Sequence, residues 1–206
     1  MSLKTFTHEA RTDFKTVGAV APSSPVLRDA MLRPLPLENA RVVVEVGCGT
    51  GVMTRGLLNR MPDGARLLGF EINPRFLSHL KSSVSDSRLE LVDASAEILR
   101  EEIERRGFKQ VDAALSSLPL AFMTEEQRKN FLGGLAEVLS EKSVFTQFRY
   151  LTGVQLKNGR FEIFRLKGVL LRYFKSVKYS IVWRNLPPAF VFVCRGPLKG
   201  GAAKSS

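Results

Sequence analysis

The sequence predicts an α/β fold: a seven-stranded, mostly parallel sheet that closes with an antiparallel hairpin near the C-terminus. Two observations support this prediction. Strand and helix signals alternate from residue 41 onward, as the helical crossovers between parallel strands require. Near the C-terminus, two runs rich in β-branched and aromatic residues are separated only by RNLPP (184–188), which is too short for a helical crossover.

The first five strands are expected to be parallel and largely buried. They are RVVVEV (41–46), ARLLGFEI (65–72), RLELVDA (88–94), VDAALSS (111–117) and SVFTQFRY (143–150). One helix is expected in each connection between these strands. The first ends near Arg60, and the second begins after Asn73 with Pro74 at its first position. The third covers 97–106, and the fourth runs from a capping box of Thr124 and Gln127 to about Leu139. The hairpin strands are KSVKYSIVW (175–183) and AFVFVCR (189–195).

The chain of 206 residues, 44% of them apolar, is expected to form one domain over residues 1–198. Within it, residues 1–35 form an N-terminal helical cap, in which Ser24 can cap a short helix that begins at Pro25. Apolar residues from Leu3 to Val17 fall on one helical stripe with a basic flank, so this amphipathic helix could lie in a membrane interface or pack on the protein's own core. The polar, Gly-rich segment 199–206 is expected to be a disordered tail.

The charge of the chain lies in its last quarter. The net charge is +11, and residues 149–206 contain twelve Lys and Arg against one acid, Glu162. Such a block favours an anionic partner, either nucleic acid or an anionic membrane surface, and a solvated basic face with no partner is the alternative. No apolar run is long enough to span a bilayer, no signal peptide is evident, and the two cysteines have no metal-ligand spacing, so a reduced intracellular protein without a metal is expected.

A glycine-rich loop, EVGCGTG (45–51), follows the first predicted strand, where open α/β sheets bind ligands. Glu71 ends the second strand, where a carboxylate can accept both ribose hydroxyls of a nucleoside, and Asp93 ends the third, where it can accept from an adenine amino group. The E-x-G-x-G-x-G spacing suits a cofactor with an α-amino group and a sulfonium better than the pyrophosphate that G-x-G-x-x-G loops bind. Glycines that serve only helix–strand packing are the alternative.

These three features, over about residues 41–195, resemble those of the class I S-adenosylmethionine-dependent methyltransferases. The resemblance implies a Rossmann-like fold and S-adenosylmethionine as cofactor, with S-adenosylhomocysteine as product. It assigns the methionine portion to Gly47, Gly49 and Gly51, the ribose to Glu71 and the adenine to Asp93. The full cofactor-binding set is Gly18, Glu45, Gly47, Gly49, Gly51, Glu71, Ile72, Asp93, Ala94 and Ser116.

The fourth strand ends in LSSLPL (115–120), the segment expected to face the transferred methyl group. Methyltransferases of nucleobase amines typically have Asn/Asp-Pro-Pro-aromatic there, and this chain has no aromatic residue before Phe122. Carbonyl or hydroxyl groups at Ser116, together with Tyr150, could orient an alkyl amine without a strong base, so these two are the candidate catalytic residues. A plain strand-to-helix turn is the alternative, and His8 and His79 are expected at the surface.

A narrower resemblance combines VGAVAPSSPVLRDAML, VEVGCGTG, LSSLPL, FTQFRY and WRNLPPAFVFV, which together are similar to the soluble bacterial phospholipid N-methyltransferases. It implies N-methylation of phosphatidylethanolamine towards phosphatidylcholine by a monomer that is cytoplasmic and peripherally attached to the inner face of the membrane. The expected partners are the phospholipid substrate, whose phosphate is assigned to Arg149, and an anionic membrane surface, with no nucleic acid. The rivals are an RNA or rRNA adenine N-methyltransferase and a membrane- or RNA-binding module with a vestigial cofactor pocket.

Overall fold

A computed structural model describes residues 24–151, 154–157, 160–163 and 165–200, and it confirms the predicted sheet. The strands are β1 (Val42–Val46), β2 (Arg66–Phe70), β3 (Leu89–Val92), β4 (Val111–Ser116), β5 (Leu139–Tyr150), β8 (Phe174–Val182) and β9 (Ala189–Pro197). Their order in the sheet is β3-β2-β1-β4-β5-β9-β8. The first five strands are parallel, whereas β9 runs antiparallel to both β5 and β8.

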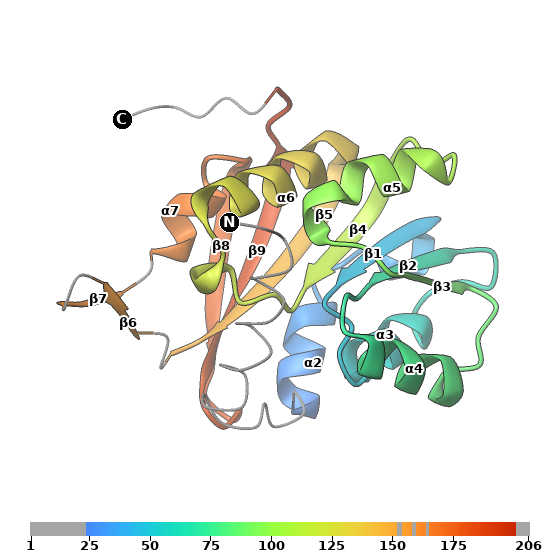
Figure 1. Ribbon diagram of the computed structural model, residues 1–206, viewed down its shortest axis with the longest axis horizontal. Helices are drawn as coiled ribbons and strands as arrows, with labels where there is room; N and C mark the ends of the chain where they lie inside the picture. Colours follow the sequence, from blue (N-terminus) through green and yellow to red (C-terminus); the bar gives the residue numbers. More distant parts are fainter. Residues whose placement is uncertain (1–23, 152–153, 158–159, 164, 201–206) are drawn as a thin grey trace.

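Helices cover both faces of this sheet (Figure 1). On one face lie α2 (Pro25–Leu32), α3 (Val52–Leu58) and α4 (Pro74–Ser83), and on the other α5 (Leu99–Arg105), α6 (Glu125–Val138) and α7 (Leu166–Leu170). Each covered face has its own apolar core, one under α2 and α3 and one under α5, α6 and α7. Strand β1, in the interior of the sheet, is buried over its whole length because it contributes side chains to both cores.

The helix starts follow the capping residues that the sequence predicts. The Ser24 side chain accepts a hydrogen bond from the Leu27 N–H at the start of α2, and the Asn73 side chain accepts one from the Arg75 N–H at the start of α4. Both hydrogen bonds of the predicted capping box are present at Thr124 and Gln127.

Three features of the fold differ from the expected boundaries. The fifth strand begins at Leu139 rather than at residue 143, directly after α6, with a register shift in its pairing to β4. The segment 96–105 begins as a 3-10 turn before α5. A two-stranded hairpin of β6 (Val154–Lys157) and β7 (Arg160–Ile163), and the short helix α7, were not predicted.

The topology brings one set of strand ends to one edge of the sheet. The carboxyl ends of β1 to β5 meet there because these strands are parallel. The turn between β8 and β9 reaches the same edge, since Tyr150 at the end of β5 pairs with Ala189 at the start of β9. We call this the carboxyl edge. Of the predicted tail, Lys199 donates hydrogen bonds to carbonyls at the end of α6, and residues 201–206 lie outside the described residues.

Candidate active site

The glycine-rich loop follows β1 at the carboxyl edge, and its backbone takes conformations that favour glycine. Gly47, Gly49 and Gly51 have φ angles of 80°, 53° and 81°, in the left-handed region that other residues adopt at a cost. A Cβ atom on Gly47 would lie 3.2 Å from the Leu118 side chain, whereas one on Gly49 would meet nothing within 4 Å. The loop therefore packs against the end of β4 at Gly47 and faces open space at Gly49.

The Glu71 carboxylate holds this loop to the loop that follows β2. One oxygen accepts a hydrogen bond from the Gly49 N–H at 2.9 Å. The other accepts from the Ile72 N–H at 2.9 Å and from the Asn73 N–H at 2.8 Å. Hydrogen bonds to an ionised carboxylate are among the stronger ones in proteins, so this nearly buried side chain orders both loops around itself.

Glu45 lies in β1 immediately before the loop and is fully buried. Neither of its carboxyl oxygens has a hydrogen-bond partner that meets normal geometry among the described residues. Burial raises its pKa to about 8, and the neighbouring Thr54 hydroxyl and Cys48 thiol offset this only in part. A buried acid without a partner is costly unless a cationic group lies beside it, so Glu45 suits a ligand with an ammonium group.

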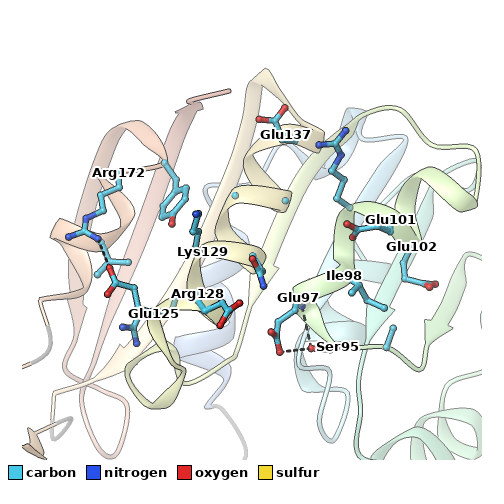
Figure 2. Close-up of a pocket in the computed structure, with 18 of the residues that line it drawn as sticks. Ser95, Glu97, Ile98, Glu101, Glu102, Glu125, Arg128, Lys129, Glu137 and Arg172 are labelled. Carbon is cyan, nitrogen blue, oxygen red and sulfur yellow. Dashed lines mark hydrogen bonds and ion pairs between the residues drawn. The ribbon is translucent and has the colours of Figure 1, made fainter. Parts of the chain in front are cut away.

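Asp93 and Ala94 directly follow β3 and are among the residues that line a groove between α5 and α6. Figure 2 shows side chains of both signs along it, with Glu101 on α5 and Arg128 and Lys129 on α6. None of the three loop glycines lines this groove, so the groove is separate from the glycine loop and Glu71. The structure places Asp93 at the carboxyl edge, exposed to solvent.

The Ser-Ser-Leu-Pro segment forms a hydrogen-bonded turn at the end of β4. The buried Ser116 hydroxyl accepts a hydrogen bond from the Leu118 N–H at 3.1 Å, and the Ser117 N–H donates to the Val46 carbonyl at 2.8 Å. The side-chain amide of Gln147 in β5 donates to the Leu118 carbonyl at 3.0 Å. This turn is therefore tied to β1 and β5 at the carboxyl edge.

Gln147 is a candidate site residue that the sequence analysis did not identify. It is fully buried, and its side-chain oxygen has no hydrogen-bond partner among the described residues. Buried polar atoms without partners are uncommon in folded proteins and are a recognised feature of functional sites. The signal was present in the sequence, because glutamine is an unusual residue in the middle of a buried strand such as FTQFRY.

The two predicted catalytic side chains project from opposite faces of the sheet. Ser116 is in register with Gln147, and Tyr150 lies three residues further along β5, which reverses the side-chain direction. Tyr150 packs under α2 with Phe148, with ring centroids 5.3 Å apart. Both residues lie at the carboxyl edge, but the structure does not bring them together on one face.

Arg149 lies on the same face as Gln147 and Ser116 because it is two residues from Gln147 in β5. Its guanidinium lies over the Phe190 ring, 5.4 Å from the centroid, and burial lowers its pKa. The residue predicted to contact the substrate phosphate is thus adjacent to the Ser116 turn, and an aromatic ring holds it there.

The predicted cofactor residue Gly18 and the apolar stripe from Leu3 to Val17 lie outside the described residues. Within the described ranges, no three His, Cys, Asp or Glu side chains are grouped so that they could hold a metal ion. No helix in the described part of the chain is long and apolar enough to cross a membrane.

Comparisons with known proteins agree with this geometry. The methyltransferase domain family matches residues 43–142. The ornithine lipid N-methyltransferase of Singulisphaera acidiphila is 30% identical over 181 residues, which cover 87% of this chain and 88% of that protein. The ribosomal RNA small subunit methyltransferase H of a Janthinobacterium species is 32% identical over 99 residues, which cover 47% of this chain but only 30% of that protein.

A solved structure extends the similarity of fold. It is the 1,6-didemethyltoxoflavin-N1-methyltransferase of Burkholderia thailandensis, which contains 1,6-didemethyltoxoflavin and S-adenosylhomocysteine. The TM-score is 0.62 at 18% identity, and the match covers 92% of this chain and 83% of that one.

Proposed function

The chain belongs to the class I S-adenosylmethionine-dependent methyltransferases, and from that premise we propose that it methylates the headgroup amine of phosphatidylethanolamine at a membrane surface. The observation that carries the proposal is the similarity to a lipid N-methyltransferase over most of both chains. The relative acts on ornithine lipid, so ornithine lipid is the second candidate substrate. The headgroups of both lipids carry an aliphatic primary amine and an acidic group.

The glycine loop and its acids fit the cofactor. S-adenosylmethionine, when bound, supplies an electrophilic methyl group on a sulfonium, so the protein mainly has to align the acceptor amine. Glu71 would hold the ribose hydroxyls with oxygens that backbone N–H groups already fix. Glu45, buried without a partner, would balance the cofactor's ammonium group, and the open space at Gly49 would admit the methionine portion.

The remaining assigned residues would complete the cofactor site. Asp93 would accept from the adenine amino group, and Ile72 and Ala94 would contact the ring beside it. Ile72 is exposed at the end of β2, where an apolar ring could cover it. Gly18 lies outside the described residues, so its assignment to the cofactor rests on the sequence resemblance.

The acceptor amine must lose a proton and present its lone pair, which needs orientation rather than a strong base. We assign this orientation to the Ser116 turn on one face and to Tyr150 on the other, so the amine would lie over the strand ends between them. Arg149, on the Ser116 face, would contact the lipid phosphate. The basic last quarter of the chain would hold the protein at an anionic surface.

RNA methylation is the alternative function that the test must exclude. A second relative methylates ribosomal RNA, and Phe122, the first aromatic residue after β4, is 61% exposed. Base stacking on an aromatic side chain contributes about 1–3 kcal/mol per base, and the Ser116 turn itself offers no such ring.

The test compares three acceptors at the same salt and cofactor concentrations. Purified protein is incubated with vesicles that contain phosphatidylethanolamine, with vesicles that contain ornithine lipid, and with ribosomal RNA, and the products are analysed by mass spectrometry. We expect methyl groups on phosphatidylethanolamine and none on RNA. Methylation of ornithine lipid alone would mean that ornithine lipid, and not phosphatidylethanolamine, is the substrate. Labelling of RNA without labelling of lipid would refute the proposal.

A further inference from the structure

The turn between β8 and β9, residues 183–188, exposes two large apolar side chains. Leu186 is 87% exposed and Trp183 is 68% exposed, more than any other large hydrophobic residue in residues 24–151 and 165–200. The turn lies at the carboxyl edge, beside α2 at the lower end of the molecule in Figure 1. Exposed apolar residues also lie elsewhere on this edge, at Ile72 after β2 and Phe122 after β4.

The turn is an ordered structure that presents these side chains outward. Asn185, between Trp183 and Leu186, is only 4% exposed. Its side-chain oxygen accepts a hydrogen bond from the Ser24 hydroxyl at 2.6 Å, and its amide donates to the Pro187 carbonyl at 2.7 Å. Because Ser24 also caps α2, the turn is fixed to the body of the protein while its apolar side chains point away from it.

The surroundings of the turn are basic and aromatic. Arg184 is exposed within the turn, and the sequence after residue 162 contains no Asp or Glu. The Arg149 guanidinium lies over Phe190, and the Lys167 ammonium lies 5.5 Å from the centroid of Tyr179. Aromatic rings with basic groups beside them suit the boundary between lipid headgroups and acyl chains, where Trp is enriched.

We propose that the β8–β9 turn is an interfacial anchor: Trp183 and Leu186 enter the headgroup region of an anionic bilayer while Arg184 contacts lipid phosphates. Insertion of the turn would direct the carboxyl edge, with the glycine loop and the Ser116 turn, towards the lipid headgroups. The inference rests on the proposed lipid substrate, and it assigns membrane contact to a segment of the described fold rather than to the N-terminal stripe.

Trp183 is the only tryptophan of the chain, so its fluorescence reports on this turn alone. The probe is a vesicle of equal parts phosphatidylglycerol and phosphatidylcholine, neither of which carries an amine to methylate. We expect the emission to shift to shorter wavelength on vesicle addition and to be quenched by lipids brominated on their acyl chains. Unchanged emission from protein that sediments with the vesicles would overturn the inference.

A matched pair of substitutions tests the contribution of the apolar side chain. Leu186→Ala should weaken partitioning into these vesicles by about five- to tenfold, because the substitution removes most of the apolar side-chain surface that would be buried in the bilayer. Leu171→Ala is the control: Leu171 is 44% exposed after α7, before β8 begins at the opposite edge, and its removal should change partitioning less than twofold. Equal effects of the two substitutions would refute a specific role for the turn.

Two further measurements separate this inference from the proposed function. Leu186→Ala should retain its turnover on a short-chain, water-soluble phosphatidylethanolamine and lose several-fold on vesicles. Methylation of vesicle lipid without any response of Trp183 would overturn the anchor and leave the proposed function intact. A full response of Trp183 with no lipid methylation would support the anchor and refute the proposed function. Emission that shifts with protein concentration before lipid is added would indicate self-association instead and would overturn the anchor.

Discussion

The proposed cofactor half of the site and the proposed substrate half are built in different ways. Around the glycine loop, the important groups are acids at the carboxyl ends of β1, β2 and β3, and backbone N–H groups hold Glu71 in place. The region from residue 149 onward has almost no acids, and its aromatic and basic side chains project from β5, β8 and β9. The first half is fixed by local turns and the second by strand register, so substitutions in the two halves should have separable effects.

The largest effect is expected at Glu71. Glu71→Ala removes the acceptor of three backbone hydrogen bonds and of the proposed ribose hydroxyls, so binding of S-adenosylhomocysteine should weaken by at least about a hundredfold. Titration calorimetry measures the affinity, and circular dichroism checks the fold. Glu38→Ala, an exposed residue in the turn before β1, is the matched control and should bind normally. Wild-type affinity of Glu71→Ala would refute the cofactor assignment.

The second effect is a dependence of stability on pH that originates at Glu45. The folded protein holds this proton up to about pH 8, whereas the unfolded chain releases it near the ordinary pKa of 4.5. Stability should therefore fall as pH rises between these two values, by an amount on the order of a few kcal/mol. The Tm of the free wild-type protein should drop by roughly 5–10 °C from pH 5 to pH 8 because of this group.

Glu45→Gln keeps the shape of the side chain and removes the titration. Its Tm should vary less between pH 5 and pH 8 than that of the wild type, which thermal unfolding at four pH values measures. Since the cofactor's ammonium group would favour the ionised carboxylate, wild-type affinity for S-adenosylhomocysteine should also rise with pH up to about 8. Parallel pH curves for the two proteins would show that Glu45 does not titrate as described.

The sequence predicted where the glycine loop, Glu71 and Asp93 lie in the fold because the signals are local. The β-branched run, the three glycines and the acids that follow the next two strands can each be recognised in a short stretch of sequence, and the parallel sheet brings them to one edge. The substrate half depends on the register between β4 and β5, which no local pattern specifies. Hence Tyr150 was correctly expected at the end of β5, but its position on the face opposite Ser116 emerged only from the structure.

The missed boundaries have the same origin. The start of β5 contains Ser140, Glu141 and Lys142, a polar stretch that reads as a loop, and it becomes a strand because a register shift lets Leu139 pair with Val111. The strands β6 and β7 are only four residues each, too short to give a clear alternation of apolar and polar residues in the sequence.

A third substitution compares two glycines with similar backbones. Gly49→Ala and Gly107→Ala both place a Cβ in the left-handed region with nothing within 4 Å, so each should cost about 1–2 kcal/mol of stability. Only Gly49 lies in the proposed cofactor loop, and only Gly49→Ala should weaken binding of S-adenosylhomocysteine, by roughly tenfold if the methyl group enters the cofactor's space. Chemical denaturation and calorimetry measure the two quantities. Equal affinities would place the cofactor away from Gly49.

The smallest effect is expected in the substrate half. Tyr150→Ala should lower methyl transfer to phosphatidylethanolamine by about three- to tenfold and leave the affinity for S-adenosylhomocysteine unchanged, because Tyr150 lies under α2 and touches neither the glycine loop nor Glu71 in the described contacts. Tyr150→Phe is the matched control: it keeps the packing on Phe148 and should restore the rate if Tyr150 only packs, but not if its hydroxyl orients the amine. Although Ser116 projects from the other face, the proposed amine contacts both residues, so the effects of Ser116→Ala and Tyr150→Ala on the rate should be less than additive in the double variant. Strictly additive effects would mean that the two side chains do not orient the same amine, and they would refute its position between the two faces.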